Sequence, residues 1–159
     1  MKKSFKLAVQ YAADHSDSAE LPARPQFRRW VRSALGEDAQ GAEIVIRIVD
    51  TAEGRALNQC YRGKDYATNV LTFVYDDTDP LSGDIVLCAD VVKKEAQQQH
   101  KPLMAHDAHL TVHGVLHLQG YDHIENDDAL IMEKMETSIL ARFGIQDPYA
   151  ELCAAASSK

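Results

Sequence analysis

The sequence has 159 residues, which suits one domain around a single core, and its 45% hydrophobic content argues against a disordered protein. Its formal net charge of −7 argues against a protein that coats nucleic acid through bulk charge. The three cysteines form no C-x-x-C pair, and no apolar run is long enough to span a membrane. We therefore expect a cytoplasmic protein with no disulfide framework, no thiolate zinc site and no membrane partner.

The first half of the chain is predicted to alternate strands and helices. Residues 5–11 alternate apolar and polar side chains, which is typical of a half-buried strand. A helix is expected over 26–35, and a second strand over 42–50 whose isoleucines face inward. A short helix follows over 51–63, with Thr51 as its N-cap.

The second half is predicted to contain two more strands and three helices. The strands are expected over 68–75 and 84–92, and the helices over 93–99, 105–118 and 127–143. This βαβαββααα order predicts an α+β fold, in which a small mixed four-stranded sheet packs against helices. We expect a single domain over 1–150 and a frayed tail over 151–159.

Three histidines lie close together in the stretch HGVLHLQGYDH. Because residues four apart on a helix are stacked about 6 Å apart along its axis, His113 and His117 point the same way. Gly120 favours the left-handed conformation that often ends a helix, and a chain turning there can return His123 to the same point. Three neutral imidazoles suit one Zn²⁺ ion per chain, with a coordination position left for water. The sequence therefore predicts a metal site on a helix and its return turn.

The other histidines are expected to have simpler roles. His106 and His109 lie close to the same helical stripe, so a merely histidine-rich face is the alternative explanation. The H-x₃-H-x₅-H spacing with a glycine in its second gap favours metal binding. We expect His106 and His109 on the helix face or behind the ligands, and His15 and His100 to be exposed.

The same spacing occurs in metzincin proteases, whose motif is H-E-x-x-H-x-x-G-x-x-H. Gly114 stands where those proteases have their general-base glutamate, so this position offers no group to take a proton from water. Glycine inside a helix also costs about 1 kcal/mol relative to alanine, and we interpret Gly114 as making room beside the metal.

On these motifs the sequence resembles the YbeY family of bacterial rRNA maturation endoribonucleases. HGVLHLQGYDH is similar to the family signature H-G-x-L-H-L-x-G-Y-D-H. LNQCYRGKDYATNVLTFVY resembles N-x-x-Y-R-x-x-x-x-T-[DN]-V-L-[ST]-F, and GDIVLCADVV resembles the family's G-D-I segment. The likeness runs from about residue 42 to 149, with Asn69 and Thr72 where many members have Asp and Ser.

The resemblance implies a zinc-dependent, single-strand-specific endoribonuclease that acts in 16S rRNA 3′-end maturation and ribosome quality control. It implies zinc ligands at His113, His117 and His123 and a functional arginine at Arg62. It also implies three partners: single-stranded RNA, the small ribosomal subunit with its 16S rRNA, and the ribosome-associated GTPase Era.

Arg62 can be given a role from its chemistry as well. A guanidinium at the end of a helix can grip a phosphate with two hydrogen bonds and stabilise charge in the transition state, whereas the alternative is a surface ion pair. Lys64 adjoins Arg62 as a second RNA-binding candidate. The attacking group would be either water or the neighbouring 2′-OH.

Further candidates surround these residues. Asp84 and Asp122 are candidate carboxylates that orient a metal ligand, although Asp84 equally suits a turn cap. The basic segment 28–32 either contacts RNA or is an ordinary solvated helix face, and we favour the second. Four aromatic residues suit stacking of unpaired bases: Tyr61, Tyr121, Phe73 and Tyr75. For Phe73, packing in the core is equally suitable.

Two other function classes remain open. One is a ribosome-assembly module in which the metal is structural, and this module would unfold when the metal is removed. The other is a metzincin-like metalloprotease, which Gly114 disfavours.

Overall fold

In the computed structural model the described residues are 5–12, 21–36, 41–75, 81–120 and 126–145, without the side chains of 126–128. They form four strands and five helices in the order that the sequence predicts. The predicted tail over 151–159 lies outside the described residues. The elements are β1 (Phe5–Tyr11), α1 (Arg24–Ala34), β2 (Ala42–Val49), α2 (Thr51–Arg62), β3 (Val70–Val74), β4 (Ser82–Cys88), α3 (Ala89–Gln98), α4 (Leu103–Leu118) and α5 (Asn126–Ala141).

The four strands form one mixed sheet in the order β1-β2-β4-β3. β1 pairs with β2, and β2 with β4, in parallel, whereas β3 pairs antiparallel with β4 and is an edge strand. Parallel neighbours cannot be joined by a tight turn, so helices α1 and α2 lie in the connections after β1 and β2. The domain is α+β with a four-stranded mixed sheet, as predicted.

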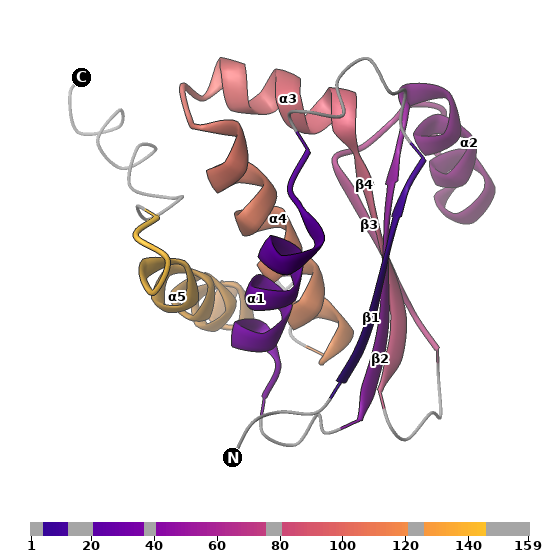
Figure 1. The fold of residues 1–159 in the computed structure, drawn as a ribbon. Helices are drawn as coiled ribbons and strands as arrows, with labels where there is room; N and C mark the ends of the chain where they lie inside the picture. The colour runs from indigo at the N-terminus through magenta and orange to yellow at the C-terminus, as the bar shows by residue number, and fades with distance from the viewer. Residues whose placement is uncertain (1–4, 13–20, 37–40, 76–80, 121–125, 146–159) are drawn as a thin grey trace.

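Helices cover both faces of the sheet (Figure 1). Ile44, Ile46 and Ile48 of β2 are at most 2% exposed and belong to the larger core, which α1, α4 and α5 complete. On the opposite face α2 covers a smaller cluster that includes Leu71 and Val86. None of the helices in the described segments is long and apolar enough to cross a membrane.

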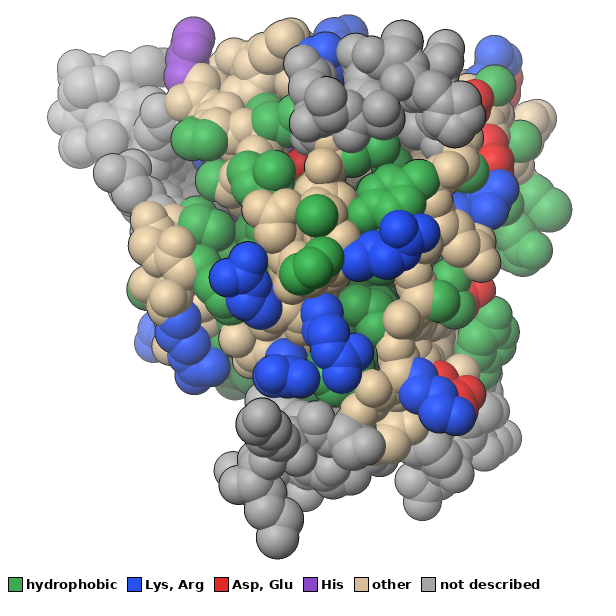
Figure 2. All heavy atoms as spheres, viewed as in Figure 1, with side chains coloured by type: hydrophobic (Ala, Val, Ile, Leu, Met, Phe, Trp, Pro, Cys, Tyr) green, Lys and Arg blue, Asp and Glu red, His purple; other side chains and the backbone are tan. Residues whose placement is uncertain are grey.

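The basic helix α1 packs its apolar side inward, with Phe27 and Val31 fully buried. The Arg24 guanidinium lies 4.9 Å from the Tyr11 ring centre, and that of Arg28 lies 4.5 Å from the Phe5 ring centre. Figure 2 shows Lys and Arg side chains spread over this face of the molecule, with few acidic ones among them. These ring contacts give Arg24 and Arg28 a packing role, and both alternatives for the segment 28–32 stay predictions.

The junction of β4 with α3 and the N-cap of α2 were predicted wrongly, whereas the other ends of the described elements agree with the predictions to within two residues. The strand expected over 84–92 ends at Cys88, and α3 begins at Ala89, because a continuous apolar run does not distinguish a buried strand from a buried helix. The N-cap of α2 is Asp50 rather than Thr51, since the Asp50 side chain accepts a hydrogen bond from the Glu53 amide at 2.9 Å.

Candidate metal centre

Four histidines form a stripe along α4. The ring centres of His106, His109, His113 and His117 follow one another at 6.2, 6.2 and 4.5 Å. Most of the other residues of this helix are apolar and buried, which fixes its rotation about its own axis. The stripe therefore has a defined orientation toward α5 and solvent.

The structure brings His113 and His117 together, as their spacing predicts. Their ring planes are 79° apart, and both side chains are half-buried. Helix α4 ends at Leu118, and Gly120 has a φ of 98°, the left-handed conformation expected for a reversal of the chain. Tyr121, Asp122 and His123 lie outside the described residues, so the third ligand stays a prediction.

The end of α4 beside His117 is held against α1 by one side chain. Gln119 Nε2 donates to the Ala34 carbonyl at 2.8 Å, and its Oε1 accepts from the Gly36 amide at 2.7 Å. Both bonds join residues more than 80 positions apart in the sequence. The last turn of α4, which carries His117, is therefore fixed to a neighbouring helix.

Glu136 of α5 is a functional candidate that the sequence analysis missed. Its carboxylate is fully buried and contacts two histidines: Oε1 contacts His113 Nδ1, and Oε2 lies 3.1 Å from His109 Nε2. A signal was present, because Glu136 interrupts the apolar stripe of Met132, Ile139 and Leu140. A charged residue within such a stripe needs a buried partner.

The described donors fit a metal ion. One ligand atom from each of His109, His113 and Glu136 lies within 4.8 Å of the others. Two histidines with a carboxylate, or three histidines, are both donor sets of catalytic zinc sites. His113 belongs to either set, because its Nδ1 contacts Glu136 and its ring centre lies 4.5 Å from that of His117.

A second carboxylate holds the start of the stripe. His106 Nε2 lies 2.9 Å from Glu95 Oε1, and Asn69 Nδ2 donates to the same oxygen at 3.0 Å. Burial lowers the pKa of His106, and Glu95 only partly offsets this shift. The lowered pKa favours the neutral imidazole, which can donate Nε2–H to Glu95. Asn69, which stands where many family members have Asp, supplies an amide donor that an ionised aspartate lacks.

The structure gives a different reason for glycine at position 114 from the one that we expected. Gly114 is buried against β4, and a Cβ atom there would lie 3.1 Å from both Cδ1 and Cγ2 of Ile85. The interpretation that Gly114 makes room beside the metal was therefore wrong, because the space is taken by Ile85. A protease-type glutamate at this position would have to displace the Ile85 side chain.

The other candidate residues lie on the opposite face of the sheet. Arg62 is the last residue of α2, is exposed, and forms no ion pair with any residue of the described segments. Tyr61 is 64% exposed and its ring meets that of Phe73 at 4.9 Å, while the neighbouring Lys64 is exposed. Asp84 accepts a hydrogen bond from the Tyr75 hydroxyl at 2.6 Å, so its described contact is with an aromatic residue and not with a histidine.

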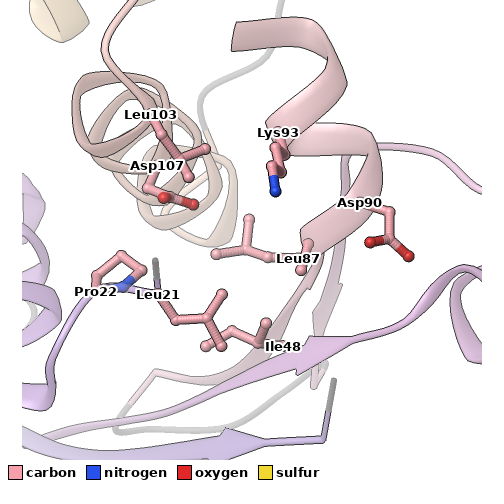
Figure 3. A pocket seen from close by; sticks show the side chains of 9 residues that line it. Leu21, Pro22, Ile48, Leu87, Asp90, Lys93, Leu103 and Asp107 are labelled. Carbon is pink, nitrogen blue, oxygen red and sulfur yellow. The ribbon is translucent and has the colours of Figure 1, made fainter. Parts of the chain in front are cut away.

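Asp107 is a buried carboxyl on the far side of α4. It is 6% exposed and faces a cavity of about 20 Å³, towards which Lys93 also extends from α3 (Figure 3). Such a cavity holds one water molecule and no substrate. Burial raises the pKa of Asp107 to about 7. Asp107 therefore bears on stability and lies apart from the candidate metal centre.

Comparison with known proteins finds a family model and relatives that carry the same family name. The family model described as Endoribonuclease YbeY matches residues 11–144. A protein named Endoribonuclease YbeY from Nitrosomonas europaea is 61% identical over 90% of this chain and 84% of its own length. Another of that name from Thiobacillus denitrificans is 55% identical over 94% of this chain and 99% of its own. The solution structure of a Thermotoga maritima protein shares the fold, with a TM-score of 0.57 and 23% identity over 95% of each chain.

Proposed function

Because the chain belongs to the YbeY family of endoribonucleases, we propose that it cuts single-stranded RNA with a zinc ion held by His113, His117 and His123. The observation that carries this proposal is the pairing of His113 and His117 on the last two turns of α4, with ring centres 4.5 Å apart. When bound, zinc would supply a Lewis acid that polarises a phosphoryl group. The histidines would supply neutral nitrogen donors on a helix that the sheet and α1 hold in place.

Arg62 is proposed to bind a backbone phosphate of the RNA strand that is cut. The nearest acidic partner in sequence, Asp65, is taken by Arg55, whose Nε and Nη2 atoms donate to the carboxylate at 2.7 and 3.0 Å. Gly63 follows in the left-handed conformation, with a φ of 69°, and ends the helix beside Arg62. Arg62 is therefore available for a two-pronged hydrogen bond to an anionic phosphate.

The edge strand β3 offers a route between Arg62 and the histidines. Helix α4 contacts β3 on one face of the sheet, and Tyr61, next to Arg62, contacts Phe73 of β3 on the other. An extended RNA strand crossing this edge would meet both faces, with the exposed rings of Tyr61 and Tyr75 placed to stack on unpaired bases. A duplex is too wide and too stiff to follow that route, which gives a reason for single-strand specificity.

A groove of about 550 Å³ near the end of α4 can receive the continuing strand. Gln119, two residues beyond His117, lies in its wall. Lys134 and Arg142 line the same groove, and their positive charges suit a phosphate backbone. These contacts are local, which agrees with an RNA-binding protein whose net charge is −7.

We propose further that the biological substrate is the 3′ end of 16S rRNA and that the setting is ribosome maturation and quality control in the cytoplasm. The small ribosomal subunit and the GTPase Era are the proposed partners. Support for this finer assignment comes from membership of the family and from the motifs shared with it.

The test is cleavage of one RNA oligonucleotide, free or annealed to its complement, by zinc-loaded protein. We expect internal cuts in the free strand and none in the duplex. Arg62→Ala is expected to lower the cleavage rate about 10²-fold, because a strand that has lost this phosphate contact is no longer held in position at the metal. Arg29→Ala is the matched control, because it removes an exposed arginine that lies on α1 instead of α2, and it should leave the rate unchanged.

Equal cutting of free strand and duplex would contradict single-strand specificity. An equal loss in the Arg29 and Arg62 variants would show that arginines act through bulk charge. Absence of cleavage by wild-type protein that binds zinc and unfolds on its removal would favour the ribosome-assembly module.

A further inference from the structure

The carboxylate of Glu136 lies in an apolar part of the core, where a charge is stable only with specific partners. Its side chain is fully buried on the inner face of α5, where its neighbours along the helix are Met132, Ile139 and Leu140. Burying an isolated carboxylate costs far more than a folded domain can spare, so the charge must be paired and hydrogen-bonded. The partners that the structure supplies are the imidazoles of His109 and His113.

The contacts are those expected of an ionised Glu136 that accepts hydrogen bonds from two imidazoles. An ionised carboxylate only accepts hydrogen bonds, so each imidazole nitrogen facing Glu136 must carry a hydrogen. His113 then donates from Nδ1 to Oε1, and His109 donates from Nε2 to Oε2 at 3.1 Å. In a neutral His113 the lone pair is consequently on Nε2, on the far side of the ring from Glu136.

The same three side chains must be weighed as direct metal ligands. Nitrogen or oxygen donors about 2.0–2.1 Å from a tetrahedral zinc ion lie about 3.3 Å from one another. The His109–Glu136 contact of 3.1 Å is within hydrogen-bond range, and Glu136 also contacts His113 through Nδ1. Each carboxylate oxygen also has its own imidazole partner. These distances favour hydrogen bonds over a shared ion.

We propose that Glu136 is a positioning residue that holds the Nε2 lone pair and the ring orientation of His113 for the metal. His109 satisfies the second carboxylate oxygen and so keeps Glu136 in place. The inference rests on the proposed metal site at His113, His117 and His123. Carboxylate–histidine–metal pairs of this kind make the ligand more basic, and losing the carboxylate typically weakens metal binding 10- to 100-fold.

The first measurement is zinc affinity, by competition with a chromophoric chelator, for wild type, Glu136→Gln, Glu95→Gln and His117→Ala. Glu136→Gln keeps the shape of the side chain and should weaken zinc binding about 10- to 100-fold. Glu95→Gln is the matched control, because Glu95 bonds the imidazole of His106, which is not a proposed ligand. It should bind zinc as the wild type does.

The second measurement uses wild-type protein alone and so does not depend on a variant that folds. With ¹¹³Cd as the metal, NMR should show the coupling of cadmium to Nε2 of His113 and a retained proton on Nδ1. Coupling through Nδ1, or to His109, would overturn the proposal by making Glu136 and His109 part of a different ligand set. This readout reports the tautomer directly, which a merely structural role for Glu136 would not set.

The zinc affinities of these variants distinguish a wrong metal site from a wrong role for Glu136. If His117→Ala binds zinc as tightly as wild type, the proposed metal site itself is wrong. If His117→Ala loses zinc but Glu136→Gln matches Glu95→Gln, only the positioning role is wrong. Loss of zinc from Glu136→Gln as complete as from His117→Ala would also overturn it, because Glu136 would then be a ligand.

Discussion

Replacing His117 with alanine is expected to lower RNA cleavage by about 10³-fold or more. A bound metal contributes several kcal/mol of charge stabilisation to a phosphoryl transition state, and about 1.4 kcal/mol corresponds to a factor of ten in rate. His117 is half-buried on the last turn of α4, and alanine is the best helix former, so the helix should persist. The measurement is the initial rate on single-stranded RNA, with bound zinc quantified and the fold checked by circular dichroism.

The control for this variant is His100→Asn. His100 is an exposed histidine between α3 and α4 with a φ of 54°, a conformation that asparagine tolerates better than alanine does. This change removes an imidazole without touching α4, and wild-type activity is expected. A folded His117→Ala protein that cleaves RNA as fast as wild type would contradict the assignment of the active site to α4.

Replacing Asp107 with asparagine is expected to stabilise the protein above neutral pH by as much as about 4 kcal/mol. Burial raises the pKa of this carboxyl from 3.8 to about 7, a shift of about three units at 1.36 kcal/mol each. Between pH 4 and 7 the unfolded chain ionises Asp107 while the folded chain does not, so ionisation favours unfolding. The cost is absent below pH 4, grows through this window and is complete above pH 7.

Urea denaturation of both proteins from pH 4 to pH 8 measures this effect. The gain in free energy of unfolding for Asp107→Asn should be near zero at pH 4 and largest at pH 8. The cavity beside Asp107 accepts the asparagine without a change of volume, since the two side chains have nearly the same shape. A constant difference across the whole range would contradict a raised pKa at this position.

The helical spacing of His113 and His117 and the left-handed Gly120 could both be read from the sequence, because they depend on local geometry alone. The order of strands and helices could be predicted for the same reason. The boundary at Cys88 could not, since the apolar run DIVLCADVV suits either a buried strand or a buried helix. Packing of Val92 and Ala96 against neighbouring elements decides in favour of helix.

The contacts that complete the site join residues far apart in the sequence, and these could not be predicted. Glu136 meets His113 across 23 positions, and Glu95 meets Asn69 across 26. The need for glycine at position 114 could not be predicted either, because it comes from contact with Ile85 of β4 and not from the helix that contains Gly114. Pattern alone placed Arg62 at the end of a helix, but the sheet order places that helix on the face opposite α4.

The central claim is that one metal ion on α4 makes this chain a ribonuclease. The most direct test is the rate of single-stranded RNA cleavage while zinc is added back to chelator-treated protein. The account predicts no cleavage without metal and a rate that rises linearly to a break at one equivalent of zinc per chain. Full cleavage by protein shown to be free of metal would contradict it.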